Sequence, residues 1–209
     1  MSRLPSWIGQ HLAALRMLIV ITVIAGIAYP LVVMGVGQAA FHNQVNGSVV
    51  TYHGRAVGSS LLCQEFTDAK GNPLSQYFQP RPSVASDPTS KTDYGCNPGF
   101  SAASNLGPNN PALVKLIQSR RQAVAKFDGV SPASVPPDAV TASASGLDPD
   151  ISPAYAYEQV NRVAAARHVS PAVIRALVAR HVKGRTLGFL GEPRVDVLSL
   201  NLALDQQLG

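Results

Sequence analysis

The stretch that decides the architecture of this chain is MLIVITVIAGIAYPLVVMGVGQAAF (residues 17–41), which contains no charged residue. A helix needs about 20 mostly apolar residues to cross a hydrocarbon core of about 30 Å. Within lipid the backbone must satisfy its own hydrogen bonds, so a spanning segment of this kind is helical. We therefore predict one transmembrane helix and its exit over residues 11–41, beginning near His11. Because Pro30 removes one backbone hydrogen bond, a kink is expected near Gly26.

The charges that flank the apolar segment predict its direction. Arg3 and Arg16 precede it, whereas the next Lys or Arg after it is Arg55. Positive residues are in excess on the cytoplasmic side of membrane helices. Residues 1–10 are therefore predicted to be a cytoplasmic tail, and residues 42–209 an extracytoplasmic domain. A signal peptide cleaved near residues 37–39 is the alternative, but its apolar region would span only about 7–15 residues, so an uncleaved anchor is favoured.

The formal net charge of the 209-residue chain is +5, and the basic residues are dispersed. The longest basic cluster is Arg120–Arg121, with Lys115 and Lys126 nearby. A nucleic-acid-binding domain usually concentrates such charge on one face, so we expect no nucleic-acid partner. The surplus suits weak attraction to anionic membrane lipid or to an acidic partner.

After the anchor, the pattern predicts short strands and turns first and helices later. Apolar pieces at residues 49–52, 61–62 and 77–78 stand among Gly, Pro, Asn and Ser and are typical of short strands. Residues 83–100 are rich in Ser, Asp, Pro and Gly and are predicted to form a long surface loop.

Three helix starts follow in the second half of the chain. Asn110–Pro111 begins a helix that Gly129 stops, because Asn is a good N-cap and Pro fits the first helical position. Ser152–Pro153 begins a second, to about His168, and Ser170–Pro171 a third, to about Lys183.

The end of the chain completes a mixed pattern. Gly184 is expected at the C-terminal cap of the third helix, residues 194–198 are expected to form a strand, and Asn201 is expected to cap a short last helix. The predicted fold is a single N-terminal transmembrane helix followed by one extracytoplasmic α/β (α+β) domain.

Cys63 and Cys96 are the only cysteines. Outside the cytoplasm they can pair, and the closed loop would then stabilise the fold by roughly 3–4 kcal/mol. Two unpaired, partly buried thiols are the alternative, because sequence alone does not bring their Cα atoms within about 7 Å. Neither cysteine has a Cys or His partner at ligand spacing, so no metal site is predicted.

The motifs of several enzyme classes are missing. There is no Gly-x-Ser-x-Gly elbow, no Gly-x4-Gly-Lys-Ser/Thr phosphate loop and no His-Glu-x-x-His pair, so no catalytic residue is predicted. Asp148–Pro149–Asp150 is interpreted as a turn that leads into a helix cap rather than as a cation loop. The pair Phe189–Leu190 lies between glycines and either folds under the domain or docks on a partner.

Four motifs carry a resemblance to a known family, and they occur in the family's order. They are YFQPRPS (residues 77–83), SNLGPNNP (104–111), VTASASGLDPDISP (140–153) and GRTLGFLGEPRV (184–195). Together with the N-terminal anchor, they resemble the C subunit of the Kdp potassium-transporting ATPase over essentially the whole chain.

This resemblance implies a non-catalytic accessory subunit of an ATP-driven, high-affinity potassium import complex in the bacterial inner membrane. The implied partners are a potassium-translocating A subunit, a P-type ATPase B subunit and a small F subunit, together with membrane lipid. The implied role is in assembly and activity, including a catalytic chaperone role that raises the ATP affinity of the B subunit. No cofactor of its own is implied, and ATP would be reached through the B subunit.

The resemblance also implies site residues. Gln64, in Leu61-Leu62-Cys63-Gln64, matches a glutamine tied to nucleotide contact in the family, although Cys63 stands where the family has glycine. The predicted orientation places Gln64 away from cytoplasmic ATP, which makes docking the physically simpler role. For partner docking we single out seven residues: Arg81, Asn105, Asn109, Asp148, Phe189, Glu192 and Arg194.

Two other classes of protein remain as alternatives. A membrane-anchored extracytoplasmic enzyme would need a nucleophile and a base, and neither is readable in the sequence. A sensor or pilus-like module would also carry one N-terminal helix, but pilin-type helices contain a Glu that this segment lacks. For helix contacts in the membrane, the small residues Gly26, Gly35 and Ala39 are the candidates.

Overall fold

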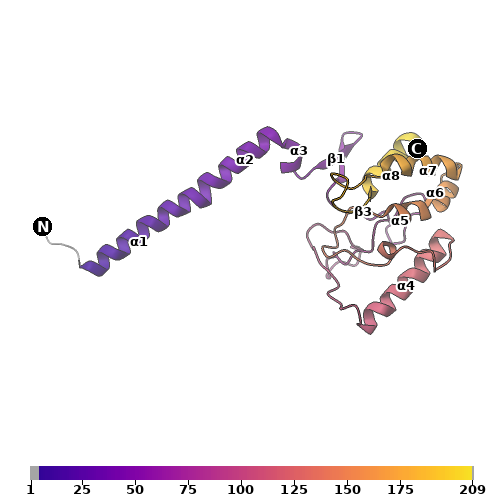
Figure 1. Cartoon of the computed structure of the whole chain (residues 1–209), viewed down its shortest axis with the longest axis horizontal. Coiled ribbons are helices and arrows are strands. Elements are labelled where there is room, and N and C mark those ends of the chain that lie inside the picture. Colours follow the sequence, from indigo (N-terminus) through magenta and orange to yellow (C-terminus); the bar gives the residue numbers. More distant parts are fainter. Residues whose placement is uncertain (1–4, 209) are drawn as a thin grey trace. The chain divides into compact units, whose positions relative to one another are not determined.

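The computed structural model describes residues 5–208 and divides the chain into two compact units, of which the second begins at Val49 (Figure 1). The first unit is one long helix and a short one. Its long helix consists of α1 (Ser6–Val23), a π-helical turn η1 (Ile24–Ala28) and α2 (Tyr29–Ala40), and the short helix α3 covers His42–Val45.

The long helix runs over 35 residues, Ser6–Ala40, and none of its residues is buried. By its length and composition it can span a membrane. It begins earlier than the predicted start near His11, directly after Pro5. Where a kink was predicted, near Gly26, the structure has the π-helical turn η1. Gly26, at its centre, lies four residues before Pro30, which cannot donate a backbone hydrogen bond.

The second unit begins with an antiparallel hairpin of β1 (Val49–Tyr52) and β2 (Arg55–Ser59). His53 and Gly54 both have positive φ angles, 49° and 75°, as a two-residue hairpin turn with the native twist requires. The strand prediction for residues 49–52 is therefore confirmed. The predictions for residues 61–62 and 77–78 are wrong, because neither pair forms a ladder with another strand.

The helix starts were predicted well and the helix ends less well. Helix α4 (Pro111–Asp128) has Asn110 as its N-cap and ends at Gly129, which has a φ of 70°. The predicted second helix is split at Gln159 into α5 (Pro153–Glu158) and α6 (Val160–Ala166). A 3₁₀ turn η2 (Pro137–Ala139) lies in the connector before them.

Near the C-terminus, one prediction is confirmed only in part and two are wrong. Helix α7 (Pro171–His181) ends before Gly184, because Lys183 instead pairs its backbone with Arg194, at 2.8 and 2.9 Å. The predicted strand at residues 194–198 shrinks to β4 (Val195–Asp196), which pairs with β3 (Asp150–Ile151).

Helix α8 (Val197–Leu208) then follows without a gap, so Asn201 lies inside it rather than at its start. The Asp196 carboxylate accepts a hydrogen bond from the Ser199 backbone N–H at 2.7 Å and takes the role expected of Asn201.

The core of this unit lies among α5, α6, α7 and α8, which cluster in Figure 1, with α4 contacting α6. Fully buried apolar side chains from these helices meet others from outside them, including Phe78, Val140, Ile151 and Val195. Phe78 brings the irregular segment before residue 80 into the core, and this contact positions the candidate site.

Candidate functional site

The site is built on an irregular segment, residues 75–82, that belongs to no strand. Its backbone is held by the side chains of helices. The amide of Asn201 accepts a hydrogen bond from the Phe78 N–H at 2.8 Å and donates one to the Phe78 carbonyl oxygen at 2.9 Å. A side-chain amide thereby supplies the pair of bonds that a neighbouring strand would otherwise supply.

Gln159 repeats this arrangement one residue further along. Its Oε1 accepts from the Gln79 N–H at 2.7 Å, and its Nε2 donates to the Gln79 carbonyl oxygen at 3.2 Å. Gln159 is fully buried, at the point where α5 passes into α6. The two amides fix the backbone that leads directly into Pro80, Arg81 and Pro82.

Arg162 holds the beginning of the same segment. Its guanidinium donates to the carbonyl oxygens of Ser75 and Tyr77, at 2.6 and 2.9 Å. It also pairs with the buried carboxylate of Asp128 at 2.6 Å and lies 4.4 Å from the centre of the Phe127 ring. Burial raises the pKa of Asp128, and the charge of Arg162 opposes that rise. The end of α4 is thus joined to the irregular segment through one arginine.

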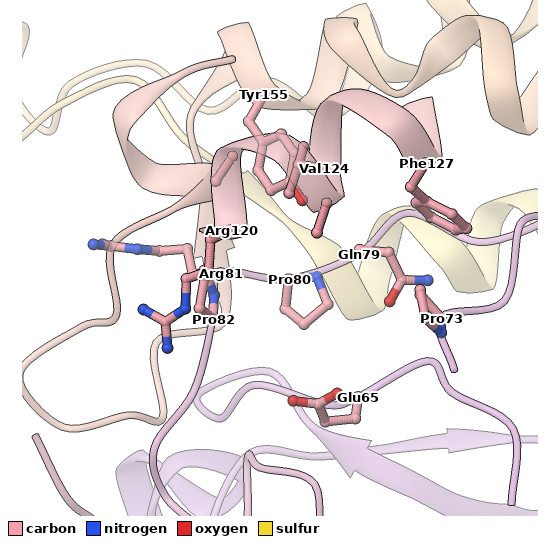
Figure 2. Close-up of a pocket in the computed structure, with 12 residues that line it drawn as sticks. Glu65, Pro73, Gln79, Pro80, Arg81, Pro82, Arg120, Val124, Phe127 and Tyr155 are labelled. Carbon is pink, nitrogen blue, oxygen red and sulfur yellow. The ribbon is translucent and has the colours of Figure 1, made fainter. Parts of the chain in front are cut away.

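A pocket of about 230 Å³ lies beside this segment (Figure 2). Helix α4 forms one wall and the chain near Glu65 forms another. Most of the lining is apolar, and its larger apolar members are Pro73, Pro80, Pro82, Val124 and Phe127. The polar lining consists of Glu65, Gln79, Arg81, Arg120 and the hydroxyl-bearing Tyr155.

Figure 2 shows how these groups are distributed around the pocket. Arg81 and Arg120 lie toward one side, Phe127 lies toward the other, and Glu65 and Tyr155 come from opposite walls. The arginine side carries positive charge, and on the opposite side the Phe127 ring lies beside the Gln79 amide. Such an arrangement can orient a small amphipathic molecule.

The two arginines differ in their partners. Arg81 pairs with the Asp148 carboxylate at 3.0 Å and also donates to the Thr141 carbonyl oxygen at 3.2 Å. Arg120 is partly buried, and its guanidinium donates a hydrogen bond to the Val140 carbonyl oxygen at 3.3 Å. Burial lowers the pKa of the Arg120 guanidinium. In the described part of the chain, no carboxylate forms an ion pair with Arg120.

Glu65 and Tyr155 are two further polar groups of the lining. Burial, with a smaller contribution from the charge of Asp93, raises the pKa of Glu65 to about 7. Tyr155 is 4% exposed, and burial raises the pKa of its phenol. Within residues 5–208, neither the Glu65 carboxyl nor the Tyr155 hydroxyl makes a hydrogen bond.

Cys63 and Cys96 form a disulfide, with their Cα atoms 5.4 Å apart. The bond joins the chain just before Glu65 to the loop that carries Asp93, and Ser83 supports that loop by accepting a hydrogen bond from the Cys96 N–H at 2.9 Å. Gln64, next to the disulfide, is partly buried. Its side-chain oxygen would lie 2.6 Å from a Cβ atom placed on Gly58, and Gln64 does not line the pocket of Figure 2.

The seven residues singled out for docking fall into two groups. Four of them, Arg81, Asp148, Glu192 and Arg194, line a second cavity, a groove of about 670 Å³. Ion pairs connect residues of this groove, at 3.0 Å for Arg81–Asp148 and 3.1 Å for Arg194–Asp150. The other three residues do not line it: Asn105, Asn109 and Phe189.

Phe189 lies in a tight turn close to the groove residues in sequence. Thr186 and Leu190 exchange backbone hydrogen bonds, both 2.9 Å long, and Leu187 and Gly188 have positive φ angles between them. Leu187 and Phe189 are 78% and 68% exposed. The question that the sequence left open is therefore answered for this chain: the apolar turn does not fold under its own domain.

Sequence reasoning missed most of the pocket. Arg120 was noticed as half of a basic pair, but nothing in the sequence separates it from the exposed Arg121. Gln79 and Arg81 lie within the motif at residues 77–83, which marks the segment without showing the pocket. Among the described residues, no group of three or more His, Cys, Asp or Glu side chains is placed to hold a metal ion.

The sequence model of one protein family, described as K⁺-transporting ATPase, c chain, matches residues 11–206. A relative from Kineococcus radiotolerans, the potassium-transporting ATPase KdpC subunit, is 49% identical over 96% of this chain and 95% of its own length. The KdpC subunit of Sorangium cellulosum is 52% identical over 92% of this chain and 95% of its own. That of Methylococcus capsulatus is 48% identical over 95% of this chain and 98% of its own.

Proposed function

Because the chain belongs to the family of the K⁺-transporting ATPase c chain, we propose that it is a non-catalytic accessory subunit of an ATP-driven potassium import complex. In this proposal it sits in the bacterial inner membrane and is needed for the complex to assemble and work. Its partners are the potassium-translocating A subunit, the P-type ATPase B subunit and the small F subunit.

The single observation that carries the proposal, beside family membership, is the exposure of the long apolar helix. None of the residues of α1, η1 and α2 is buried within this chain. Exposed apolar side chains of that extent require lipid or other membrane helices as neighbours. A Cβ atom placed on Gly35 would meet nothing within 4 Å, so this face leaves room for the close approach of another helix.

We propose that the second unit lies outside the cytoplasm and docks on the A subunit. Arg3 and Arg16, which precede the apolar segment in the sequence, favour that direction. The groove that contains Arg81, Asp148 and Arg194 offers charged groups, and the turn with Phe189 offers exposed apolar surface. Large apolar anchors beside polar groups are typical of protein interfaces.

The family resemblance also implies an effect on the ATP affinity of the B subunit. We propose that this effect is transmitted through subunit contacts rather than through nucleotide bound at Gln64. Gln64 carries no charge, and the sequence around it has no glycine-rich loop to hold phosphates. ATP bound by the B subunit then remains the only nucleotide that the mechanism needs.

The test is to purify the complex in mild detergent with and without this chain and to measure potassium-stimulated ATP hydrolysis. We expect co-purification with the P-type subunit and loss of most potassium-stimulated activity when the chain is absent. Gly35→Leu should reduce the amount of this chain that co-purifies with the complex, because it changes a helix contact in the membrane. Phe189→Ser should reduce it because it changes a contact of the second unit. Val173→Ser, at another exposed apolar residue, should leave co-purification unchanged. Full potassium-stimulated hydrolysis by a complex that lacks this chain would refute the proposal.

A further inference from the structure

We propose that the pocket between α4 and residues 79–82 binds a small organic carboxylate with an apolar body and a second hydrogen-bonding group. This inference concerns a ligand of the chain itself. It holds or fails independently of how the chain docks on other subunits.

Arg120 is the group in the pocket that would bind an anion. Five arginines in the described part of the chain are buried wholly or in part, and four of them have a carboxylate partner: Arg81, Arg162, Arg167 and Arg194. Arg120 is the exception, with only a carbonyl oxygen at 3.3 Å. Removing a guanidinium from water costs free energy unless an opposite charge compensates. A bound carboxylate would supply that charge with matching, bidentate geometry.

Tyr155 would bind a second, hydrogen-bonding group of the ligand. It is 96% buried, since 4% of its surface is exposed, and it lines the pocket. Its hydroxyl makes no hydrogen bond within residues 5–208, whereas the hydroxyl of Tyr77, a partly buried tyrosine, donates to Asp205 at 3.1 Å. Among the described residues, the buried side-chain oxygen without a partner is Glu158 Oε1, so the Tyr155 hydroxyl is open to the pocket, where a ligand group can pair with it.

The walls and the volume restrict what lies between these two groups. Pro80, Val124 and Phe127 present apolar surface, and the cavity of about 230 Å³ is smaller than the pockets that hold drug-sized ligands. A ring or a branched chain of a few carbon atoms fits this space. A nucleoside triphosphate, with several negative charges and a sugar, suits neither the volume nor the apolar lining.

The probe for this site is 4-hydroxybenzoate, which carries a carboxylate and a hydroxyl at opposite ends of an apolar ring. Two analogues isolate its ends. In 4-hydroxybenzamide a neutral amide of the same shape replaces the carboxylate, and benzoate lacks the hydroxyl. Calorimetric titration of the full chain in detergent micelles at about pH 6 should give saturable binding of 4-hydroxybenzoate. The amide should bind roughly tenfold more weakly or worse, because it cannot form the charge-assisted pair with Arg120.

Two substitutions assign these differences to residues. Arg120→Gln should lower the affinity for 4-hydroxybenzoate roughly tenfold and leave that for the amide unchanged, whereas Arg121→Gln removes an exposed charge on the same helix and should change neither. Tyr155→Phe should lower the affinity for 4-hydroxybenzoate several-fold and should hardly change the affinity for benzoate. Arg120→Lys should restore part of the affinity for the carboxylate.

Several results would overturn the inference. These are no saturable binding of either carboxylate up to about 10 mM, equal losses with Arg120→Gln and Arg121→Gln, or tighter binding of inorganic phosphate than of 4-hydroxybenzoate. Circular dichroism shows whether each variant remains folded. If a variant does not fold, the comparison of carboxylate with amide on the unmodified chain still decides whether the site requires an anion. Loss of pump assembly in other variants has no bearing on these titrations.

Discussion

Asn201 and Phe78 are 123 residues apart in sequence, yet the side-chain amide of Asn201 bonds both the N–H and the carbonyl oxygen of Phe78. Both residues are buried, at 1% and 0% exposure. The bonds connect the last helix to the irregular segment that leads into the pocket. The polar backbone of this segment is therefore buried without forming a sheet, and the fold of the unit depends on a few amide side chains.

Asn201→Ala should destabilise the protein by about 2–4 kcal/mol, because it leaves a backbone donor and a backbone acceptor of Phe78 buried without partners. Thermal unfolding of the full chain in detergent, followed by circular dichroism, measures the effect as a lower Tm. The matched control is Asn161→Ala on α6, whose side chain is exposed. Equal unfolding temperatures for the two variants would mean that the amide of Asn201 does not hold this segment.

The disulfide leads to a second prediction. Its cysteines enclose a loop with a sequence separation of 33 residues, and cross-linking such a loop stabilises a protein by roughly 3–4 kcal/mol in the chain-entropy account. Reduction with dithiothreitol should therefore lower the Tm of the unmodified chain. The double variant Cys63→Ser, Cys96→Ser should already melt at the lower temperature and should not respond to the reductant. A response of the double variant would show that the reductant acts elsewhere.

Local signals in the sequence predicted those features that local chemistry determines. Asn110 before Pro111 correctly predicted the start of α4, because both residues act within one helical turn. Gly129 correctly predicted its end for the same reason. The apolar segment correctly predicted the long helix, because length and hydropathy are properties of the segment alone. Each of these structures forms without reference to distant parts of the chain.

The wrong predictions concern residues whose partners are distant in sequence. Tyr77–Phe78 has the composition of a strand, but the backbone of this pair bonds the side chains of Arg162 and Asn201 and not a neighbouring strand. Asn201 was taken for a helix cap because Asn favours that position, and the need of Phe78 for a partner prevailed over that local preference. Arg120 could not be distinguished from Arg121 for the same reason, since only the packed fold shows which one turns toward the pocket.

Gly146, in the motif at residues 140–153, allows a comparison with a glycine of the same backbone conformation. Gly146 and Gly129 both have a φ of 70°. A Cβ atom on Gly146 would lie 2.7 Å from the Ala102 carbonyl oxygen and 2.8 Å from the Ala85 Cβ, whereas one on Gly129 would meet nothing within 4 Å. Gly129→Ala should therefore cost about 1 kcal/mol for the left-handed backbone alone, and Gly146→Ala about 1–3 kcal/mol more for the clash.

The same thermal measurement separates the two contributions. The difference in Tm between the two alanine variants reports the steric cost, because the cost of the backbone conformation is common to both. If Gly146→Ala were no less stable than Gly129→Ala, the loop at Ala85 would have to move aside freely. That result would contradict the tight contact between the motif and the disulfide-linked loop.

Glu65 gives a pH-dependent prediction. Its pKa is about 7 in the folded protein, raised from an ordinary value of 4.5 by burial and by Asp93, with Arg81 and Arg120 lining the same pocket. Between these two values the folded state holds a proton that the unfolded state has released. Stability therefore falls as the pH rises from about 4.5 to about 7, and it stays lower above that. The full loss is about 2–4 kcal/mol.

Glu65→Gln removes this titration and keeps the shape of the side chain. The variant should match the unmodified chain at about pH 4.5 and exceed its Tm by roughly 5–10 °C at pH 8, where ionised Glu65 destabilises the fold. Glu158, whose pKa burial also raises to about 7, is present in both proteins, so the difference between them isolates Glu65. Glu192→Gln, at a carboxylate whose side chain is 78% exposed, controls for the loss of one negative charge. A Tm advantage of Glu65→Gln that is the same at both pH values would contradict the assignment, because a gain from packing does not depend on protonation.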